Sequence, residues 1–348
     1  MQAKETSEAM KTVLRSRLTA ALALSVTAAL GVSACTSSAG ARGGSKKIAI
    51  VAFSVPKPAY DAAETAFKQT SAGKGVTFSE SYDASGTQSK AVAAGQPADY
   101  VGFSLEPDMT KLVPKFVDAN WNAGSTAGIV SSSVVVICVR KGNPKRITGW
   151  DDLIKPGVKI VTPDPASSGS AKWNILAAYE HVIAEGGTTA QAGSYLTSFF
   201  KNVVSKPTSG ADATTTFSKG TGDVLISYEN EAINARQKGI GLDYIVPKES
   251  VLIQNPAAVT KGAPSVAKQF LAYVESAAGQ KIFAAHGFRP VDSIVSPGTV
   301  QGANDPSNPF PKVDKLVTVA SLGGWAKVNT EFFDPDKGIV TKIENNAG

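Results

Sequence analysis

Short apolar runs alternate with stretches of helical spacing along most of the chain. Strand-like runs occupy 47–54, 75–83, 98–104, 131–144 with its closing Gly-Asn-Pro turn, 158–164 and 243–247, and a strand leads into a helix over 222–232. Helical spacing occupies 59–70, 86–95, 151–154, 171–187 and, as one or two helices, 263–288. Alternation of this kind predicts an α/β fold with largely parallel sheets.

Two of the expected helices carry a distinct apolar face. One face, within 59–70, consists of Tyr60, Ala63 and Phe67. The other, within 171–187, consists of Trp173, Leu176, Ala177, Tyr179 and Ile183. Spacings of three and four residues place such side chains on one side of a helix. The glycines at 186 and 187 are expected to end the second helix.

Small and hydroxyl residues follow three of the expected strands, in the turns 53–56, 83–86 and 166–169. In open α/β sheets, ligands bind outside the carboxyl ends of strands, where helix N-termini converge. We therefore expect the three turns to line one cleft.

The third turn has the composition of an anion site. Ser167, Ser168 and Gly169 precede the helix, and no lysine or arginine occurs between them and Lys172. Unpaired N–H groups, hydroxyl donors and the positive end of the helix dipole together attract anions. Alternatively, Ser168 is simply an N-cap, since serine is a preferred residue there.

The N-terminal 45 residues are predicted to lie outside the globular part. Basic residues from Lys11 to Arg17 precede an uncharged run over 18–31, which is the pattern of an export signal. The sequence Val-Ser-Ala-Cys that ends at Cys35 resembles a lipobox, so we expect a lipoprotein signal peptide over 1–34, lipidation of Cys35 and a flexible tether over 35–45. The alternative is an uncleaved membrane anchor.

Composition narrows the remaining possibilities. With 348 residues, 43% of them hydrophobic, the chain is long enough for about two domains. The net charge of +6 is spread along the sequence without a dense basic cluster, which argues against a nucleic-acid partner. Cys138 lies in an apolar run and is expected to be a buried free thiol.

The motifs of enzymes are largely missing. His181 and His286 have no partner at metal-ligand spacing, and we expect no metal site and no cofactor. Glu229 and Glu231 stand at a strand-to-helix junction, where acidic residues more often cap a helix than transfer protons. A secreted hydrolase with Ser168 or Ser85 as nucleophile is the alternative of another class, although it lacks a positioned base.

Several segments resemble the sulfate and thiosulfate-binding proteins of bacterial ABC importers. They are 140–180, 199–203, 209–217, 220–232 and 323–327, and they occur in the order of that family. The resemblance implies a periplasmic-binding-protein type II fold of two α/β lobes with mixed sheets, joined by two crossover strands. It places the first lobe at 46–129 plus 246–348 and the second at 130–245. We accordingly expect an exported monomer, anchored to the cell membrane by lipid, that delivers its ligand to a permease.

The resemblance also implies which residues hold the oxyanion, all of them as uncharged donors. Backbone N–H groups are expected from Val55, Gly169, Ser170 and Ala211, and hydroxyl groups from Ser85, Ser168 and Tyr228. A site made of donors suits sulfate, which has no proton to donate near neutral pH.

Three residues depart from the family pattern. Ser170 replaces a glycine, Tyr228 replaces a tryptophan, and Asp212 replaces an arginine beside the site. An Asp212 carboxylate facing the ligand would favour a protonated oxyanion, so phosphate or molybdate remains an alternative ligand. We expect Asp212 to face solvent, because charged side chains are mostly exposed.

Overall fold

The computed structural model describes residues 46–291 and 295–347. The predicted signal peptide over 1–34, the tether over 35–45 and Cys35 lie outside the described residues. Within the described part, no helix is both long enough and apolar enough to cross a membrane.

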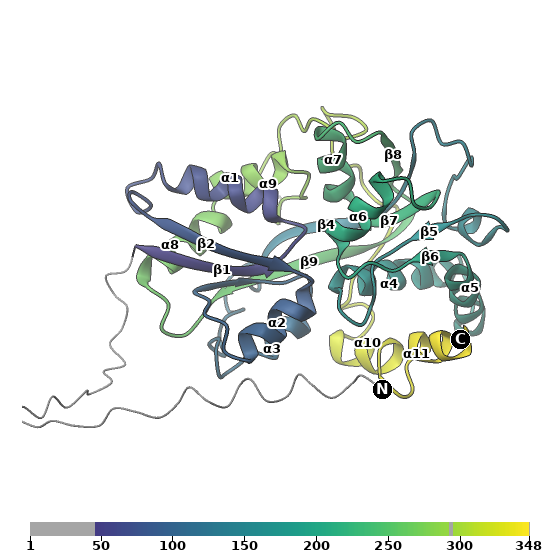
Figure 1. Ribbon diagram of the computed structural model, residues 1–348, viewed down its shortest axis with the longest axis horizontal. Coiled ribbons are helices and arrows are strands. Elements are labelled where there is room, and N and C mark those ends of the chain that lie inside the picture. Colours follow the sequence, from purple (N-terminus) through teal and green to yellow (C-terminus); the bar gives the residue numbers. More distant parts are fainter. Residues whose placement is uncertain (1–45, 292–294, 348) are drawn as a thin grey trace, which may run out of the picture. The chain divides into compact units, whose positions relative to one another are not determined.

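The first lobe is a sheet with helices on both faces (Figure 1). Its strands run in the order β2-β1-β3-β9, and β1, β2 and β3 are parallel to one another. The strands are β1 (Lys47–Phe53), β2 (Thr77–Asp83), β3 (Tyr100–Gly102) and β9 (Glu249–Val259). The helices are α1 (Lys57–Phe67), α2 (Ser85–Ala93), α3 (Glu106–Thr110), α8 (Ser265–Glu275) and α9 (Ala277–Ala285).

Two layers of apolar side chains hold this lobe together. Tyr60 and Phe67 of α1 pack edge-on against Phe283 of α9 and Phe270 of α8 on one face of the sheet. Val92 of α2 belongs to a separate cluster, which includes residues of α3 and covers the other face. Because both faces are covered, β1 is apolar nearly throughout instead of alternating.

The second lobe continues the sheet in the order β4-β7-β5-β6, with β8 also paired to β4. Its strands are β4 (Ile129–Arg140), β5 (Ile160–Val161), β6 (Val203–Ser205), β7 (Val224–Tyr228) and β8 (Leu242–Ile245). Its helices are η1 (Trp150–Ile154), α4 (Gly169–Ala184), α5 (Thr189–Lys201), α6 (Gly210–Ser218) and α7 (Glu229–Gln237). Cys138 on β4 is a buried free thiol, as predicted.

The long strands β4 and β9 connect the two lobes. They pair antiparallel with each other from Ile129 to Val134, while the rest of β4 pairs with β7 and β8 and the end of β9 pairs with β3. The expected two-lobe α/β architecture with two crossover strands is therefore present.

The C-terminal part of the chain forms β10 (Lys315–Val317), α10 (Trp325–Phe332) and α11 (Ile339–Ala347). The strand β10 pairs parallel with the beginning of β9, whereas α10 packs on the second lobe. Trp325 lies edge-on to Trp173 of α4 with 4.8 Å between ring centroids, and Phe332 meets Tyr179 of α4 at the same distance. We expected 246–348 as a whole to belong to the first lobe, whereas α10 contacts the second. The other lobe bounds stay predictions.

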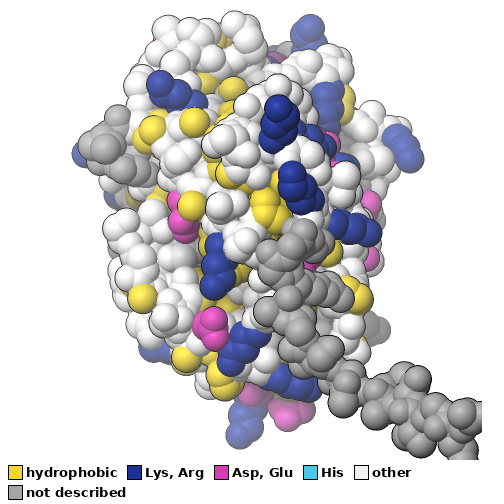
Figure 2. Space-filling model, turned by 90° about the vertical axis from the view of Figure 1, so that its left-hand side faces the viewer, with side chains coloured by type: hydrophobic (Ala, Val, Ile, Leu, Met, Phe, Trp, Pro, Cys, Tyr) yellow, Lys and Arg dark blue, Asp and Glu magenta, His cyan; other side chains and the backbone are white. Residues whose placement is uncertain are grey.

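The charged side chains show no concentrated basic surface on the face drawn in Figure 2. Lys and Arg side chains are spaced over that face between uncharged atoms, with few acidic ones. This distribution agrees with the sequence, in which basic residues are scattered.

Candidate anion-binding site

A small hollow lies where strands of both lobes end, and we call it the interlobe hollow. Its empty space, including the solvent at its mouth, is about 150 Å³. It is lined mostly by small and hydroxyl residues: Phe53, Ser54, Val55, Asp83, Ala84, Ser85, Ser104, Ser168, Gly169, Ser170, Ser209 and Gly210. These residues lie at or beyond the carboxyl ends of β1, β2, β3, β5 and β6. This is the position at which α/β sheets bind ligands.

Four helices begin at the hollow: α1, α2, α4 and α6. The first N–H groups of a helix have no acceptor within it, and the helix dipole makes this end positive. In α4 the side chain of Ser168, the N-cap residue, makes no capping hydrogen bond. Its hydroxyl and the N–H groups of Gly169 and Ser170 are therefore positioned to donate to an anion.

The side chains that line the hollow are mostly uncharged. No lysine or arginine is among the described residues that line it. The carboxylate in its lining belongs to Asp83, an exposed residue whose Oδ1 accepts a hydrogen bond from the N–H of Ala84 at 2.6 Å. The attraction for a negative ligand must then come from backbone N–H groups, hydroxyl groups and helix dipoles.

The two lobes touch directly around the hollow. The hydroxyl groups of Ser104, which follows β3, and Tyr228, at the end of β7, are 2.8 Å apart. Trp173 of α4 donates from Nε1 to the Ser104 carbonyl at 3.0 Å, and the Gly86 N–H donates to the Ser167 carbonyl at 3.2 Å. The described structure is thus a closed arrangement of the lobes.

Two glycines allow this close approach. A Cβ atom on Gly169 would lie 2.6 Å from Ser104 Oγ and 2.8 Å from Leu105 Cγ, both in the first lobe. A Cβ atom on Gly210 would lie 3.1 Å from a methyl group of Val55. A side chain at position 169 would hold the lobes apart, whereas one at position 210 would first meet Ser170 Oγ of its own lobe, at 2.9 Å.

The hydroxyl of Ser85 already makes two hydrogen bonds within the protein. It donates to Asp108 Oδ2 at 2.7 Å and accepts from the Ser104 N–H at 3.0 Å. Asp108 is buried and also pairs with Lys111 at 2.8 Å. We expected this hydroxyl to donate to the ligand, but its single proton goes to Asp108 here. The backbone N–H of Ser85, in the first turn of α2, is the donor that remains.

Asp212 lies beside the hollow but is not among its lining residues. It is exposed, and its Oδ2 accepts hydrogen bonds from the hydroxyl groups of Ser209 at 2.7 Å and Thr208 at 3.0 Å. Its own N–H donates to Ser209 Oγ, so the pair caps α6. This position agrees with the expectation that its carboxylate is solvated.

The structure brings most of the expected site residues together. Val55, Ser85, Ser168, Gly169 and Ser170 line the hollow. The remaining two adjoin it: Ala211 follows Gly210, and the Tyr228 hydroxyl contacts Ser104.

Sequence reasoning missed Ser104, Ser209 and Gly210 as lining residues. Ser104 ends the apolar run 98–104, and Ser209 is the N-cap of α6. Both are hydroxyl residues at the end of a strand or the start of a helix, which is the pattern that identified the other turns. The same pattern in the sequence could therefore have identified them.

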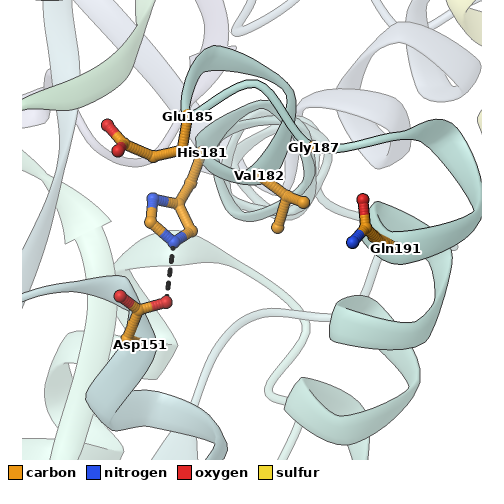
Figure 3. A pocket seen from close by; sticks show the side chains of 6 residues that line it. All are labelled: Asp151, His181, Val182, Glu185, Gly187 and Gln191. Atoms are coloured by element: carbon orange, nitrogen blue, oxygen red, sulfur yellow. Dashed lines mark hydrogen bonds and ion pairs between the residues drawn. The ribbon is translucent and has the colours of Figure 1, made fainter.

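The histidines lie elsewhere and contact no serine of the hollow. Figure 3 shows His181 of α4 in a separate pocket, where its Nε2 lies 3.1 Å from Asp151 Oδ1. Its Nδ1 faces Glu249 at 3.4 Å. His286 contacts the side chain of Asn234 at 3.3 Å. A serine hydrolase requires a base beside its nucleophilic serine. Neither imidazole is placed to be that base for Ser85 or Ser168.

Comparison with known proteins agrees with this geometry. Residues 48–289 match the family model described as bacterial extracellular solute-binding protein. The chain belongs to the bacterial extracellular solute-binding proteins. As such it is an exported binding protein of the transport class, and the relatives below are named as binding proteins, not as enzymes.

Three relatives of this solute-binding protein cover most of its length. The sulfate-binding protein of Synechococcus elongatus is 37% identical over 92% of this chain and 94% of its own. The thiosulfate-binding protein of Pseudomonas aeruginosa is 32% identical over 82% and 88%, respectively. The solved structure of the sulfate-binding protein SubI from Mycobacterium tuberculosis is 42% identical over 83% and 99%, with a TM-score of 0.77. The resemblance to SubI confirms the predicted fold class.

Proposed function

We propose that this protein captures sulfate in the interlobe hollow and delivers it to the permease of an ABC importer. The observation that carries the proposal is the hollow itself, where four helices begin and no lysine or arginine is among the described lining residues. Such a site offers a dianion many fixed donors whose positions are set by the fold. The names of the relatives support sulfate as the ligand.

The donors come from both lobes, so one anion can hold the lobes together. From the first lobe we assign the N–H groups of Val55 and Ser85. From the second we assign Ser168, through its hydroxyl, together with the N–H groups of Gly169, Ser170 and Ala211. Tyr228 contributes its hydroxyl, and because burial raises the pKa of Tyr228 this group remains a protonated donor at neutral pH.

Selectivity follows from the balance of donors and acceptors. Sulfate accepts hydrogen bonds and has none to give near neutral pH, whereas a phosphate that retains protons needs an acceptor. A buried hydrogen bond left unmade lowers affinity by several orders of magnitude when the site is rigid, about 10⁴-fold or more in strong cases. The solvated position of Asp212 removes one candidate acceptor, and the Asp83 carboxylate in the lining is exposed and already accepts from the Ala84 N–H. This balance favours sulfate over a phosphate that retains protons. Molybdate, like sulfate, has no proton to donate near neutral pH, so titration decides between these two anions.

We further propose that the mature protein is a monomer tethered to the cell membrane by lipid on Cys35. Its support is the lipobox-like sequence before Cys35 and the Ser/Gly/Ala-rich segment that follows. The tether would keep the binding lobes close to the permease. Metabolic labelling with a fatty-acid probe, compared between the wild type and Cys35→Ala, tests the anchor.

Isothermal titration of a soluble chain that begins after Arg42 tests the ligand. We expect tight sulfate binding that is equal at pH 6 and pH 8, because backbone N–H and serine O–H groups do not titrate in that interval. Phosphate should not compete. Binding of phosphate, or sulfate affinity that changes steeply between the two pH values, would contradict a site of neutral donors.

Thiosulfate is the second candidate ligand, supported by the thiosulfate-binding relative. Thiosulfate has the same charge and tetrahedral shape with one larger sulfur atom in place of an oxygen. Parallel titration with thiosulfate decides which anion binds more tightly.

A further inference from the structure

A second cluster of charged side chains lies on the first lobe, where α1 faces the edge strand β2. Lys57, Asp61 and Glu64 follow one another on α1 at spacings of four and three residues, so they share a helix face. Glu80 and Tyr82 are two residues apart on β2 and point to the same side of the sheet. We call these five residues the α1–β2 niche.

The niche already holds a positive charge. The Lys57 ammonium lies 2.7 Å from Asp61 Oδ1 and 2.7 Å from Glu80 Oε2. It also stands 4.9 Å from the centre of the Tyr82 ring, within the range of a cation–π contact. Three different side chains thus direct negative charge or electron density at one point.

The niche also contains polar atoms that this ammonium leaves unsatisfied. Glu64 is only 4% exposed, and its Oε1 is buried without a hydrogen-bond partner in the described structure. The Tyr82 hydroxyl is likewise buried without a partner there. A buried carboxyl oxygen without a hydrogen-bond partner is costly, because it has lost its hydration and gained nothing in exchange.

The carboxylates are close enough to share one ion. One oxygen from each of Asp61, Glu64 and Glu80 lies within 4.8 Å of the others. Two oxygens bound to one Ca²⁺ ion at 2.3–2.6 Å can be no farther apart than about 5 Å, so this spacing is compatible with common ligands of a single ion.

We propose that the α1–β2 niche binds a divalent cation, with Ca²⁺ as the best match. Asp61, Glu64 and Glu80 would supply carboxylate oxygens, while water completes the shell. An all-oxygen set with flexible spacing suits Ca²⁺ better than Zn²⁺, which prefers nitrogen and sulfur ligands, or Mg²⁺, which requires a compact octahedron. This site is distinct from the proposed anion site and does not depend on it.

Lys57 is the competitor of the ion. Its side chain is 45% exposed and sits on the first turn of α1, so the ammonium can move into solvent and leave both carboxylates to the metal. Ca²⁺ would then join α1 to the edge strand β2 in place of the lysine. Binding an ion only in the folded state raises the melting temperature as the ion concentration increases.

Two substitutions with opposite expected effects test the proposal. Calcium chloride is titrated into the mature protein, with binding followed by calorimetry and by the melting temperature. For the wild type we expect a dissociation constant of about 10⁻⁴ to 10⁻³ M, the range of extracellular calcium modules. Glu64→Gln should weaken binding at least about tenfold, since it replaces a carboxylate ligand with an amide. Lys57→Met should strengthen binding, because it removes the competing ammonium.

Glu331→Gln on α10 is the matched control. Glu331 is an exposed glutamate paired with Lys327 four residues away, as Asp61 is paired with Lys57. This variant should bind Ca²⁺ as the wild type does. The proposal fails if the wild type shows no calcium binding up to about 10 mM, well above the range expected for such modules. It also fails if Glu64→Gln and the wild type bind equally, or if Lys57→Met does not gain affinity. Sulfate titration of each variant separately reports whether the anion site is intact.

Discussion

The Ser104 hydroxyl of the first lobe lies 2.8 Å from the Tyr228 hydroxyl of the second, and both side chains are buried. This contact exists only when the lobes are together. It therefore links the stability of the closed arrangement to one hydroxyl pair beside the interlobe hollow.

Removal of the Tyr228 hydroxyl should weaken sulfate binding without unfolding the protein. In Tyr228→Phe the ring remains in the core, while the contact with Ser104 and one proposed donor are lost. A neutral hydrogen bond contributes about 1 kcal/mol, so we expect affinity to fall roughly 5- to 30-fold for one or two such bonds. Titration calorimetry measures the change. Tyr273→Phe on α8, outside the lining, is the matched control, and an equal loss there would remove the special role of Tyr228.

A methyl group at position 169 should block closure. The Cβ atom of Gly169→Ala would lie 2.6 Å from Ser104 Oγ and close to Leu105 of the opposite lobe, so the clash arises between lobes. We expect at least about a hundredfold loss of sulfate affinity, since closure and the α4 N–H donors are affected together.

Gly193→Ala is the control for this substitution. Gly193 lies within α5, where an added Cβ would meet nothing within 4 Å. This variant should keep sulfate affinity and gain about 0.5–1 kcal/mol of helix stability. If Gly169→Ala binds sulfate as the wild type does, the close approach of the lobes is not needed for binding.

Lys172 should make stability depend on pH in the alkaline range. Burial lowers the pKa of Lys172 from 10.5 to about 8, although Asp108 opposes this shift. Between pH 8 and 10.5 the unfolded chain therefore binds more protons at this site than the folded chain. Since stability rises with pH wherever the unfolded state binds more protons, the free energy of unfolding should increase across this window.

Urea unfolding between pH 7.5 and 10.5 measures this effect. Lys172→Met should reduce the rise relative to the wild type, because the buried ammonium is gone. Lys201→Met, at an exposed position at the end of α5, should leave the rise unchanged. Identical slopes for Lys172→Met and the wild type would assign the pH dependence to other groups.

Removal of Arg289 from its pair with Glu229 should be among the most destabilising charge substitutions. Glu229 is fully buried and receives two hydrogen bonds from Arg289, at 2.7 and 3.1 Å. Arg289→Ala would leave the carboxylate buried without a counter-charge, which costs about 3–5 kcal/mol. The exposed pair of Lys327 and Glu331 provides the comparison, and Lys327→Met should cost less than about 1 kcal/mol in urea unfolding. Equal losses would mean that burial of Glu229 has no energetic consequence.

Local patterns predicted β1, β2, β3 and β5 and the helices α1, α2 and α4 around the hollow, but not β6, α6 or all of the other elements. The strand β9 escaped prediction because its sequence contains Pro256 and polar residues. Proline cannot donate to a neighbouring strand, and the register with β4 shifts at the point where Pro256 faces Ile129. The pairing partners of β9 lie far away in the chain, so no short window of sequence shows them.

Helix α4 illustrates a second limit. The sequence predicted one apolar face, whereas the structure buries nearly the whole helix over its first three turns. The additional cover includes Trp325 and Phe332 of α10, a helix of eight residues for which the sequence pattern produced no prediction. Short helices draw their stability from tertiary packing, which a periodicity analysis does not see.

The candidate site was predicted at the level of turns, and the hydrogen bonds within it were not. Ser85 was expected to face a ligand because it follows a strand and begins a helix. Its partner Asp108 is 23 positions away in the sequence, and only the fold brings the two together. Residue types thus indicated an anion site, while the direction of each hydroxyl depended on contacts between distant segments.

Because four helix starts supply the positive potential of the hollow, that potential belongs to the main chain and to no particular side chain. Ser170, which stands where the family pattern has a glycine, illustrates a change that alters the lining but leaves the backbone N–H group in place. A site of this kind tolerates sequence drift as long as each helix begins at the same residue. Insertions or deletions in the preceding turns, which shift those starting points, are the changes to which it is vulnerable.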